Sequence, residues 1–127
     1  MKISRIDHIV LTVSDVAQAT RFYHEVFDMP VIQQQSTAEV TTLRCGHQLI
    51  RLQQAGRDAR KAAHPTVGSA DLCIVTRDDL ADVYRHLQSY YVKIESEPIA
   101  KQGSEGQMHS IYLRDPDDNL IEIASYK

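Results

Sequence analysis

One carboxylate in this 127-residue sequence lies where only a specific interaction can account for it. Glu122 belongs to the run Leu-Ile-Glu-Ile, which directly follows the sequence Asp-Pro-Asp-Asp-Asn of residues 115–119. Proline fixes a backbone φ angle and Asp and Asn side chains bond their own backbone, so we expect a tight turn between two strands. A charge within a buried apolar strand requires a hydrogen bond, an ion-pair partner or a metal ion. Glu122 is therefore the first candidate for a functional residue.

The first half of the sequence is similar to the second, and aligning the two halves relates Glu122 to three other polar residues. Aligning the apolar run that follows His8 with the one that follows Asp71 places these two residues on each other. Aligning Leu-Ile-Arg-Leu with Leu-Ile-Glu-Ile places Arg51 on Glu122. Repetition within a sequence indicates a structure built from equivalent units. We therefore expect two pseudo-symmetric pairs of positions, His8 with Asp71 and Arg51 with Glu122.

The elements that position these residues follow the same order in both halves. Residues 6–13 predict a buried strand, and Ser14 or Asp15 can cap a helix that stops at residues 28–30. Further strands of the first half are predicted at residues 31–35, 39–44 and 48–53.

The second half repeats this order after a connection at about residues 55–69, where glycine and proline interrupt any strand pattern. A helix is predicted over about residues 78–91. The strands of this half are predicted at residues 71–76, 92–95, 108–113 and 120–126. We interpret residues 101–107, which contain two glycines, as a loop that is either a mobile lid or an ordinary connection.

Period-two alternation predicts which strand side chains point away from the helices. On four strands these are His8, Val10 and Thr12; Leu49, Arg51 and Gln53; Asp71, Cys73 and Val75; and Leu120, Glu122 and Ala124. On the penultimate strand, Ile111 and Leu113 should face the helices, which turns Ser110 and Tyr112 to this same side. These two hydroxyls either bind substrate oxygens or belong to a half-exposed rim.

Composition excludes several classes of partner. The formal net charge is −3 and the sequence pI is about 6.0, so no basic field is available for nucleic acid or anionic lipid. No apolar run approaches the ~20 residues of a membrane span. Cys45 and Cys73 are too few for a disulfide framework and are predicted to be buried free thiols. We therefore expect a soluble cytoplasmic protein with a small-molecule substrate.

Three motifs together resemble the vicinal oxygen chelate superfamily, which includes glyoxalase I, fosfomycin-resistance enzymes, extradiol dioxygenases and bleomycin-binding proteins. They are the opening Asp-His-Ile-Val-Leu, the helix Ala-Thr-Arg-Phe-Tyr-His-Glu-Val-Phe and the closing Asp-Pro-Asp-Asp-Asn-Leu-Ile-Glu-Ile. The resemblance is to small single-domain, glyoxalase-like members. It implies an α+β fold in one domain of residues 1–127, with module one at about 3–54 and module two at about 70–127. The two βαβββ modules would form an open, cup-shaped, eight-stranded mixed sheet with the helices outside, completed in a homodimer.

The resemblance also implies a metal centre with His8, Asp71 and Glu122 as ligands. One imidazole and two carboxylates suit a divalent ion such as manganese, iron, nickel or zinc, with positions left for adjacent substrate oxygens. Arg51 falls on the fourth ligand position of glyoxalase I, and a guanidinium cannot ligate a metal. We expect Arg51 to pair with an anionic substrate group instead. Gln53 is an alternative ligand or hydrogen-bond donor, or else a polar rim residue.

Two functions from different classes remain open. The first is a metal-dependent lyase, isomerase or transferase. In an isomerase, Glu122 can leave the metal and act as the catalytic base, and with iron the same site would suit a dioxygenase. The second is a metal-free dimeric protein that sequesters a small molecule. In that case Arg51 and Glu122 form a buried ion pair, and Asp71 accepts a hydrogen bond from His8.

Overall fold

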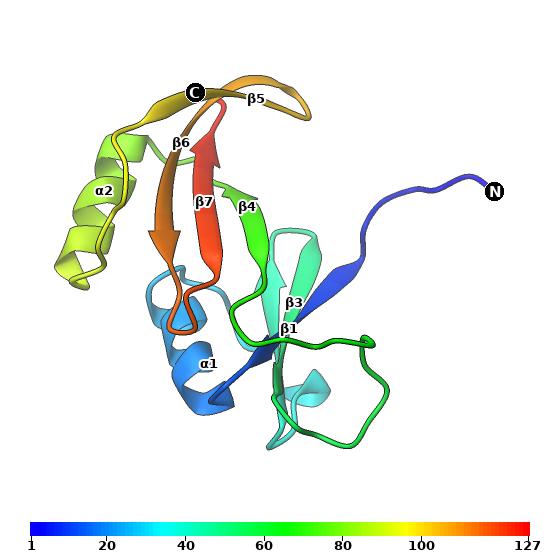
Figure 1. Cartoon of the computed structure of the whole chain (residues 1–127). Helices are drawn as coiled ribbons and strands as arrows, with labels where there is room; N and C mark the ends of the chain where they lie inside the picture. Colours follow the sequence, from blue (N-terminus) through cyan, green and yellow to red (C-terminus); the bar gives the residue numbers. More distant parts are fainter. The chain divides into compact units, whose positions relative to one another are not determined.

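The computed structural model describes all residues, 1–127, and the chain divides into two compact units, Met1–Gly68 and Ser69–Lys127 (Figure 1). Each unit contains one α-helix and one mixed β-sheet. The predicted α+β class is therefore confirmed. None of the helices has the length and apolar character needed to cross a membrane.

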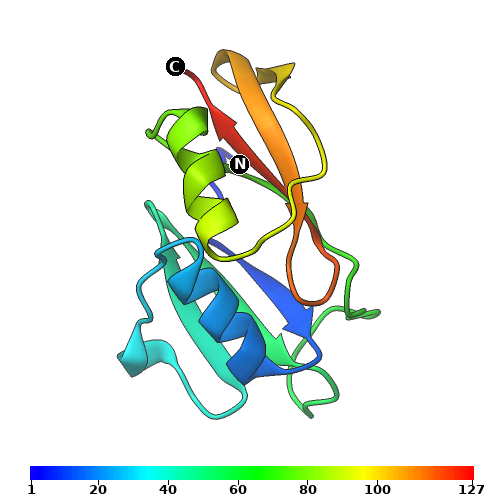
Figure 2. The same ribbon diagram turned by 90° about the vertical axis from the view of Figure 1, so that its left-hand side faces the viewer.

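The first unit has a three-stranded sheet with the order β1-β3-β2, in which β1 is parallel and β2 antiparallel to β3. Its elements are β1 (His8–Val13), α1 (Val16–Glu25), the 3-10 helix η1 (Gln33–Gln35), β2 (Val40–Cys45) and β3 (Gln48–Gln54). Asp15 caps α1, since its Oδ1 atom accepts a hydrogen bond from the Gln18 amide at 3.1 Å. The helix lies along one face of this sheet and buries Ala19 and Tyr23 against it (Figure 2).

The strand predicted at residues 31–35 is wrong. Only Val31 forms a bridge, to Leu43, and the chain then turns into η1. Side chains replace the ladder here: the Thr42 hydroxyl donates to the Gln35 carbonyl at 2.7 Å, and the Thr42 amide donates to the Ser36 hydroxyl at 3.1 Å. Such local bonds offer the backbone an alternative to strand pairing, which explains why the strand ends at once.

The second unit has a four-stranded sheet with the order β4-β7-β6-β5, in which only the β4–β7 pair is parallel. Its elements are β4 (Asp71–Val75), α2 (Leu80–Ser89), β5 (Ile99–Gly103), β6 (Gly106–Arg114) and β7 (Leu120–Ser125). Helix α2 buries Leu87, and Ile111 and Leu113 of β6 are fully buried. Because α2 contacts β6, the predicted assignment of these two β6 residues to the helix side agrees with the structure.

Two predictions for the second unit are wrong, and the structure has seven strands in place of the expected eight. Residues 92–95 contribute only a bridge between Ile94 and Leu113. Residues 101–107 are not a loop: they belong largely to the β5–β6 hairpin, in which Gly103 pairs with Gly106. Gly106 has a φ of 122°, which closes a two-residue turn at little steric cost. β5 is an exposed edge strand with the sequence Ile-Ala-Lys-Gln-Gly, so no alternation of apolar residues marks it in the sequence.

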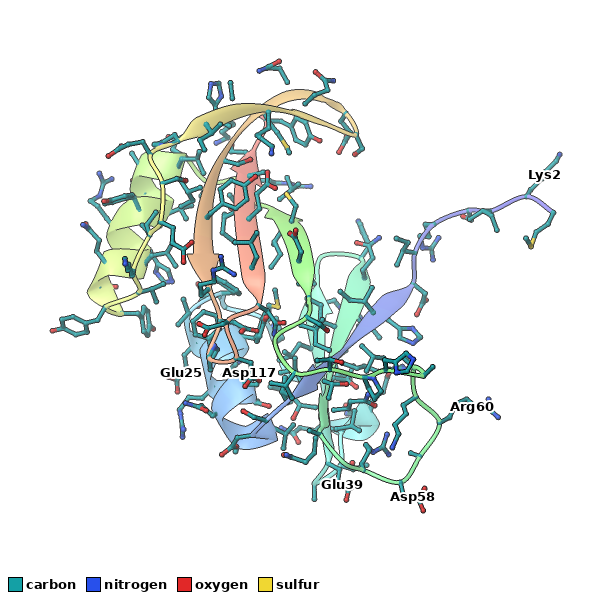
Figure 3. All side chains as sticks on the ribbon, viewed as in Figure 1. Lys2, Glu25, Glu39, Asp58, Arg60 and Asp117 are labelled. Atoms are coloured by element: carbon teal, nitrogen blue, oxygen red, sulfur yellow. The ribbon has the colours of Figure 1, made fainter.

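The predicted turn at residues 115–119 is confirmed, with Asp117 labelled at its tip in Figure 3. The buried Asp115 carboxylate accepts hydrogen bonds from the Asp117 amide at 2.9 Å, the Asn119 amide at 2.9 Å and Asn119 Nδ2 at 2.8 Å. Asn119 Oδ1 in turn accepts from the Ala70 amide at 2.8 Å. The turn thus fixes the start of β4 beside the start of β7, which sets the register of the strand that carries Glu122.

Candidate functional site

The strand registers confirm the equivalence inferred from internal similarity. In the first unit, the third residue of β1 lies opposite Arg51 of β3. In the second unit, the third residue of β4 lies opposite Glu122 of β7. His8 and Asp71 are the first residues of β1 and β4, so they occupy matching places beside these pairs. Each unit therefore presents two of the four predicted positions on one sheet face.

Glu122 is half-buried in β7, with β4 on one side and β6 on the other. Ser110 Oγ donates a hydrogen bond to Glu122 Oε2 at 2.5 Å, and the Tyr112 hydroxyl donates to Oε1 at 3.2 Å. Ser110 is fully buried, and Tyr112 lies directly opposite Glu122 in the strand register. The two hydroxyls orient the carboxylate, and the Cys73 thiol is a further hydrogen-bond partner of it. A carboxylate has about four lone-pair sites, so capacity remains for a ligand or a proton.

Lys101 is a part of this face that sequence reasoning missed, because residues 101–107 were interpreted as a loop. Its Nζ atom lies 5.6 Å from the centroid of the Tyr112 ring. Hydrogen bonding to Tyr112 raises the pKa of Lys101, and the charges of Glu122 and Asp71 act in the same direction. The structure thus places a cation within the electrostatic reach of the Glu122 carboxylate.

Cys73 lies opposite Glu122 on β4, on the predicted face, but its predicted burial is wrong because the residue is exposed. Cys45 is half-buried. Partial burial and then the negative charge of Glu122 raise the pKa of Cys73 to about 11. The thiol is therefore protonated at neutral pH, which makes it a poor nucleophile.

In the first unit, His8 is bonded at both ring nitrogens. Its Nδ1 atom lies 2.8 Å from Asp7 Oδ1, and this bond lowers the pKa of Asp7. Arg51 Nη1 lies 3.1 Å from His8 Nε2, and Arg51 Nη2 donates to Gln35 Oε1 at 3.1 Å. A carboxylate only accepts and a guanidinium only donates, so these contacts fit an imidazole that donates from Nδ1 and accepts at Nε2. Sequence reasoning named His8 and Arg51 but neither of their other partners, Asp7 and Gln35.

The two remaining sequence candidates have different surroundings. Gln53 is buried and donates to the Thr12 hydroxyl at 2.9 Å, a bond within its own sheet. Asp71 is an exposed residue at the start of β4. Neither unit by itself gathers three His, Cys, Asp or Glu side chains at metal-binding distance. Imidazole and carboxylate are donor types that divalent ions accept, but His8 belongs to the first unit, where its Nε2 atom faces Arg51 Nη1, and Asp71 and Glu122 belong to the second.

The fold and these strand positions define a protein built from two similar units, each with one helix and one mixed sheet. The model of the Glyoxalase/Bleomycin resistance protein/Dioxygenase superfamily matches residues 5–123. The chain belongs to this superfamily, so the expected family is confirmed.

Relatives of the chain agree with this assignment. It is 42% identical over 127 residues to Virulence protein STM3117 of Salmonella typhimurium, covering 99% of this chain and 87% of that protein. It is 38% identical over 128 residues to Glyoxalase domain-containing protein RDO1 of Mycosarcoma maydis, covering 100% of this chain and 71% of that protein. The structure of an integron cassette protein from the mobile metagenome of V. Cholerae is similar with a TM-score of 0.93, at 42% identity, over 100% of this chain and 98% of that chain.

Proposed function

We propose that the chain is a metal-dependent enzyme of the lyase or isomerase type, acting on a small substrate that presents adjacent oxygens to a divalent ion. The observation that carries this proposal is the environment of Glu122. Its half-buried carboxylate is oriented by two hydroxyls, and no Lys or Arg of its own unit forms an ion pair with it. A carboxylate taken partly out of water and held by neutral donors is suited to receive a cation.

His8, Asp71 and Glu122 are the proposed ligands of the ion, which is manganese, iron, nickel or zinc. The bond from His8 Nδ1 to Asp7 supports His8 in this role, because metal-ligating histidines commonly donate their second ring N–H to a carboxylate. The ion would supply Lewis acidity toward the substrate oxygens. The proposal requires the two units to present these ligands to one ion, either within one chain or across a homodimer.

The remaining side chains have defined tasks under this proposal. Glu122 holds or moves a proton at one carboxylate oxygen, while Ser110 and Tyr112 keep the carboxylate in place and bind substrate oxygens. Arg51 binds an anionic group of the substrate, and Gln53 supports that face through its bond to Thr12. With iron as the bound ion, the same ligands would suit a dioxygenase.

Two further parts of the proposal concern assembly and location. β1 and β4 each occupy an edge of their sheet, and an edge strand offers unpaired backbone groups to a partner strand, which supports a homodimer. The two free cysteines fit a reducing compartment, and we propose the cytoplasm.

A metal-free binding protein is the second candidate, and one observation favours it. Arg51 already donates to His8 Nε2, the nitrogen that a metal would need. In such a protein the polar residues of the two sheet faces would hold a small molecule by hydrogen bonds and charge alone.

Calorimetric titration of the metal-free chain with Mn²⁺, Ni²⁺ and Zn²⁺ separates the two candidates. The enzyme proposal predicts stoichiometric binding that Glu122→Gln weakens about tenfold or more, since the variant removes a charged ligand of similar size. Glu97→Gln is the matched control, because Glu97 is exposed in the same unit and should leave binding unchanged. Absence of metal binding by the unaltered chain would support the metal-free candidate. Unchanged metal binding by Glu122→Gln would show that Glu122 is not a metal ligand.

A further inference from the structure

Arg51 is a half-buried cation that no carboxylate neutralises. Its guanidinium is held at both terminal nitrogens, since Nη2 donates to Gln35 Oε1 at 3.1 Å and Nη1 lies 3.1 Å from His8 Nε2. No ion pair of the first unit includes Arg51, because the carboxylate of Asp7 is bonded to His8 instead. A charge that is taken partly out of water without a counter-ion favours the binding of an anion.

The guanidinium of Arg51 keeps donors for such an anion. An arginine side chain carries five N–H groups in one plane, and the contacts with Gln35 and His8 use only those of the two terminal nitrogens that face them. Unused N–H groups can match the two oxygens of a carboxylate, which a guanidinium binds through parallel, charge-assisted hydrogen bonds. Because both ends of the plane are already held, the group loses little freedom when an anion binds.

Gln35 reaches Arg51 because β2 holds the end of η1 in place. The Thr42 hydroxyl donates to the Gln35 carbonyl at 2.7 Å, and the fully buried Thr42 lies directly opposite Arg51 in the β2–β3 register. This bond fixes the main chain of Gln35 beside the strand that carries the guanidinium. The amide oxygen of Gln35 is a neutral acceptor, so it orients the guanidinium and leaves the positive charge for a ligand.

An exposed apolar side chain lies beside the guanidinium. Val10 of β1 is directly opposite Arg51 in the parallel register, so the two side chains share one face of the sheet, and Val10 is 47% exposed. Helix α1 lies on the other face, where the Thr20 hydroxyl donates to the Thr41 hydroxyl at 2.8 Å. An apolar surface next to an unpaired cation suits a ligand whose carboxylate is attached to a short aliphatic chain.

We propose that the first unit contains a carboxylate site of its own, in which Arg51 binds the anion, Gln35 positions the guanidinium and Val10 contacts the carbon chain. The site is formed without a metal ion and without any residue of the second unit. The inference rests on the proposed function only where it identifies this ligand with the substrate, whose class it narrows to small aliphatic carboxylates.

Butyrate is the probe, added to the metal-free full chain and followed by the ¹H–¹⁵N NMR signals of the main-chain amides and of Arg51 Nε. We expect saturable shifts at Arg51 and Val10 with a Kd of about 1–10 mM, the strength of one paired anion and a few apolar atoms. Butyramide, which has a similar shape without the charge, should bind at least about tenfold more weakly. No saturable shift at these residues, or equal binding of the amide, would overturn the proposal.

Replacement of the cation tests its role directly. Arg51→Met should weaken butyrate binding at least about tenfold, because the charge-assisted hydrogen bonds are lost. Arg21→Met is the matched control, since Arg21 is exposed on α1 and carries the same charge, and its Kd should stay unchanged. Equal losses in the two variants would assign the binding to net charge and contradict the site.

Two variants test Gln35 as a positioning residue. Gln35→Met removes the acceptor at similar length, so it should shift the Arg51 Nε signal in the ligand-free chain and weaken butyrate binding severalfold. Gln35→Glu keeps acceptor oxygens but supplies a carboxylate, so it should pair with Arg51 and abolish butyrate binding, a result that also decides the case if Arg51→Met does not fold. Butyrate binding by Gln35→Glu equal to that of the unaltered chain, or an unchanged Arg51 Nε signal in Gln35→Met, would contradict this role.

The outcomes distinguish this inference from the proposed function. Butyrate binding by a chain that binds no Mn²⁺ would retain the carboxylate site and contradict the metal-dependent enzyme. Mn²⁺ binding by a chain that does not bind butyrate would retain the enzyme and contradict the carboxylate site.

Discussion

Replacing Asp115 by Ala should cost this small protein a large part of its stability. The carboxylate is only 5% exposed and accepts three hydrogen bonds, two from main-chain amides and one from the Asn119 side chain. Each buried donor left without an acceptor costs about 1–3 kcal/mol, although water can reach the half-buried Asp117 amide. We therefore expect a loss of about 3–5 kcal/mol, against about 5–15 kcal/mol for a typical domain.

Urea unfolding followed by circular dichroism measures this loss, with two variants to divide it. Asp115→Asn keeps one acceptor oxygen but turns an NH₂ group toward Asn119 Nδ2, so it should lose only about 1–2 kcal/mol. Asp118→Asn removes the same charge from an exposed residue, and asparagine tolerates its φ of 65°, so the free energy of unfolding should change by less than about 0.5 kcal/mol. A loss below about 1 kcal/mol for Asp115→Ala would refute the assigned role of the turn.

Two further predictions concern the second unit. Gly103→Ala should destabilise the β5–β6 hairpin by about 1–3 kcal/mol in urea unfolding, because a Cβ atom there would collide with the Tyr126 hydroxyl and lie 2.7 Å from Met108 Sδ. Adding Tyr126→Phe should recover part of this loss, and no recovery would show that the hydroxyl is not the obstacle. Alkylation of Cys73 by iodoacetamide, followed by peptide mass spectrometry, should be slow at neutral pH and accelerate as the pH rises toward its pKa of about 11. Glu122→Gln should lower the pKa of Cys73 and speed the reaction at a given pH. An unchanged rate would show that the Glu122 charge does not act on the Cys73 thiol.

The sequence predicted correctly those parts of the fold that depend on neighbouring residues in the chain. The turn at residues 115–119 follows from its side chains, and the position of Glu122 on the sheet face opposite the buried Ile121 and Ile123 follows from period-two alternation. The predictions of a strand at residues 31–35 and of a loop at residues 101–107 were wrong for opposite reasons. In the first segment, hydroxyl side chains on neighbouring residues replaced the ladder that apolar residues had indicated. In the second, an exposed edge strand formed without an alternating apolar pattern, because its neighbour β6 supplied all of its pairing.

For the candidate site, too, the sequence predicted strand positions but not side-chain contacts. Alternation and internal similarity identified His8, Arg51 and Glu122, because these depend on strand register alone. The contacts of these side chains were beyond the sequence, since they depend on rotamers and on residues outside the repeated strands. Gln35 reaches Arg51 from η1, an element that was predicted as a strand. Lys101 reaches Tyr112 from a segment that was predicted as a loop.

The metal content of the chain, purified without chelator or nickel resin, tests the central claim most directly. Elemental analysis should find close to one divalent ion per site in the unaltered chain and a strong reduction in Glu122→Gln, prepared in parallel. This result would assign Glu122 as a metal ligand. The absence of any stoichiometric ion, in the purified chain and after addition of Mn²⁺, Ni²⁺ or Zn²⁺, would contradict the metal-dependent enzyme.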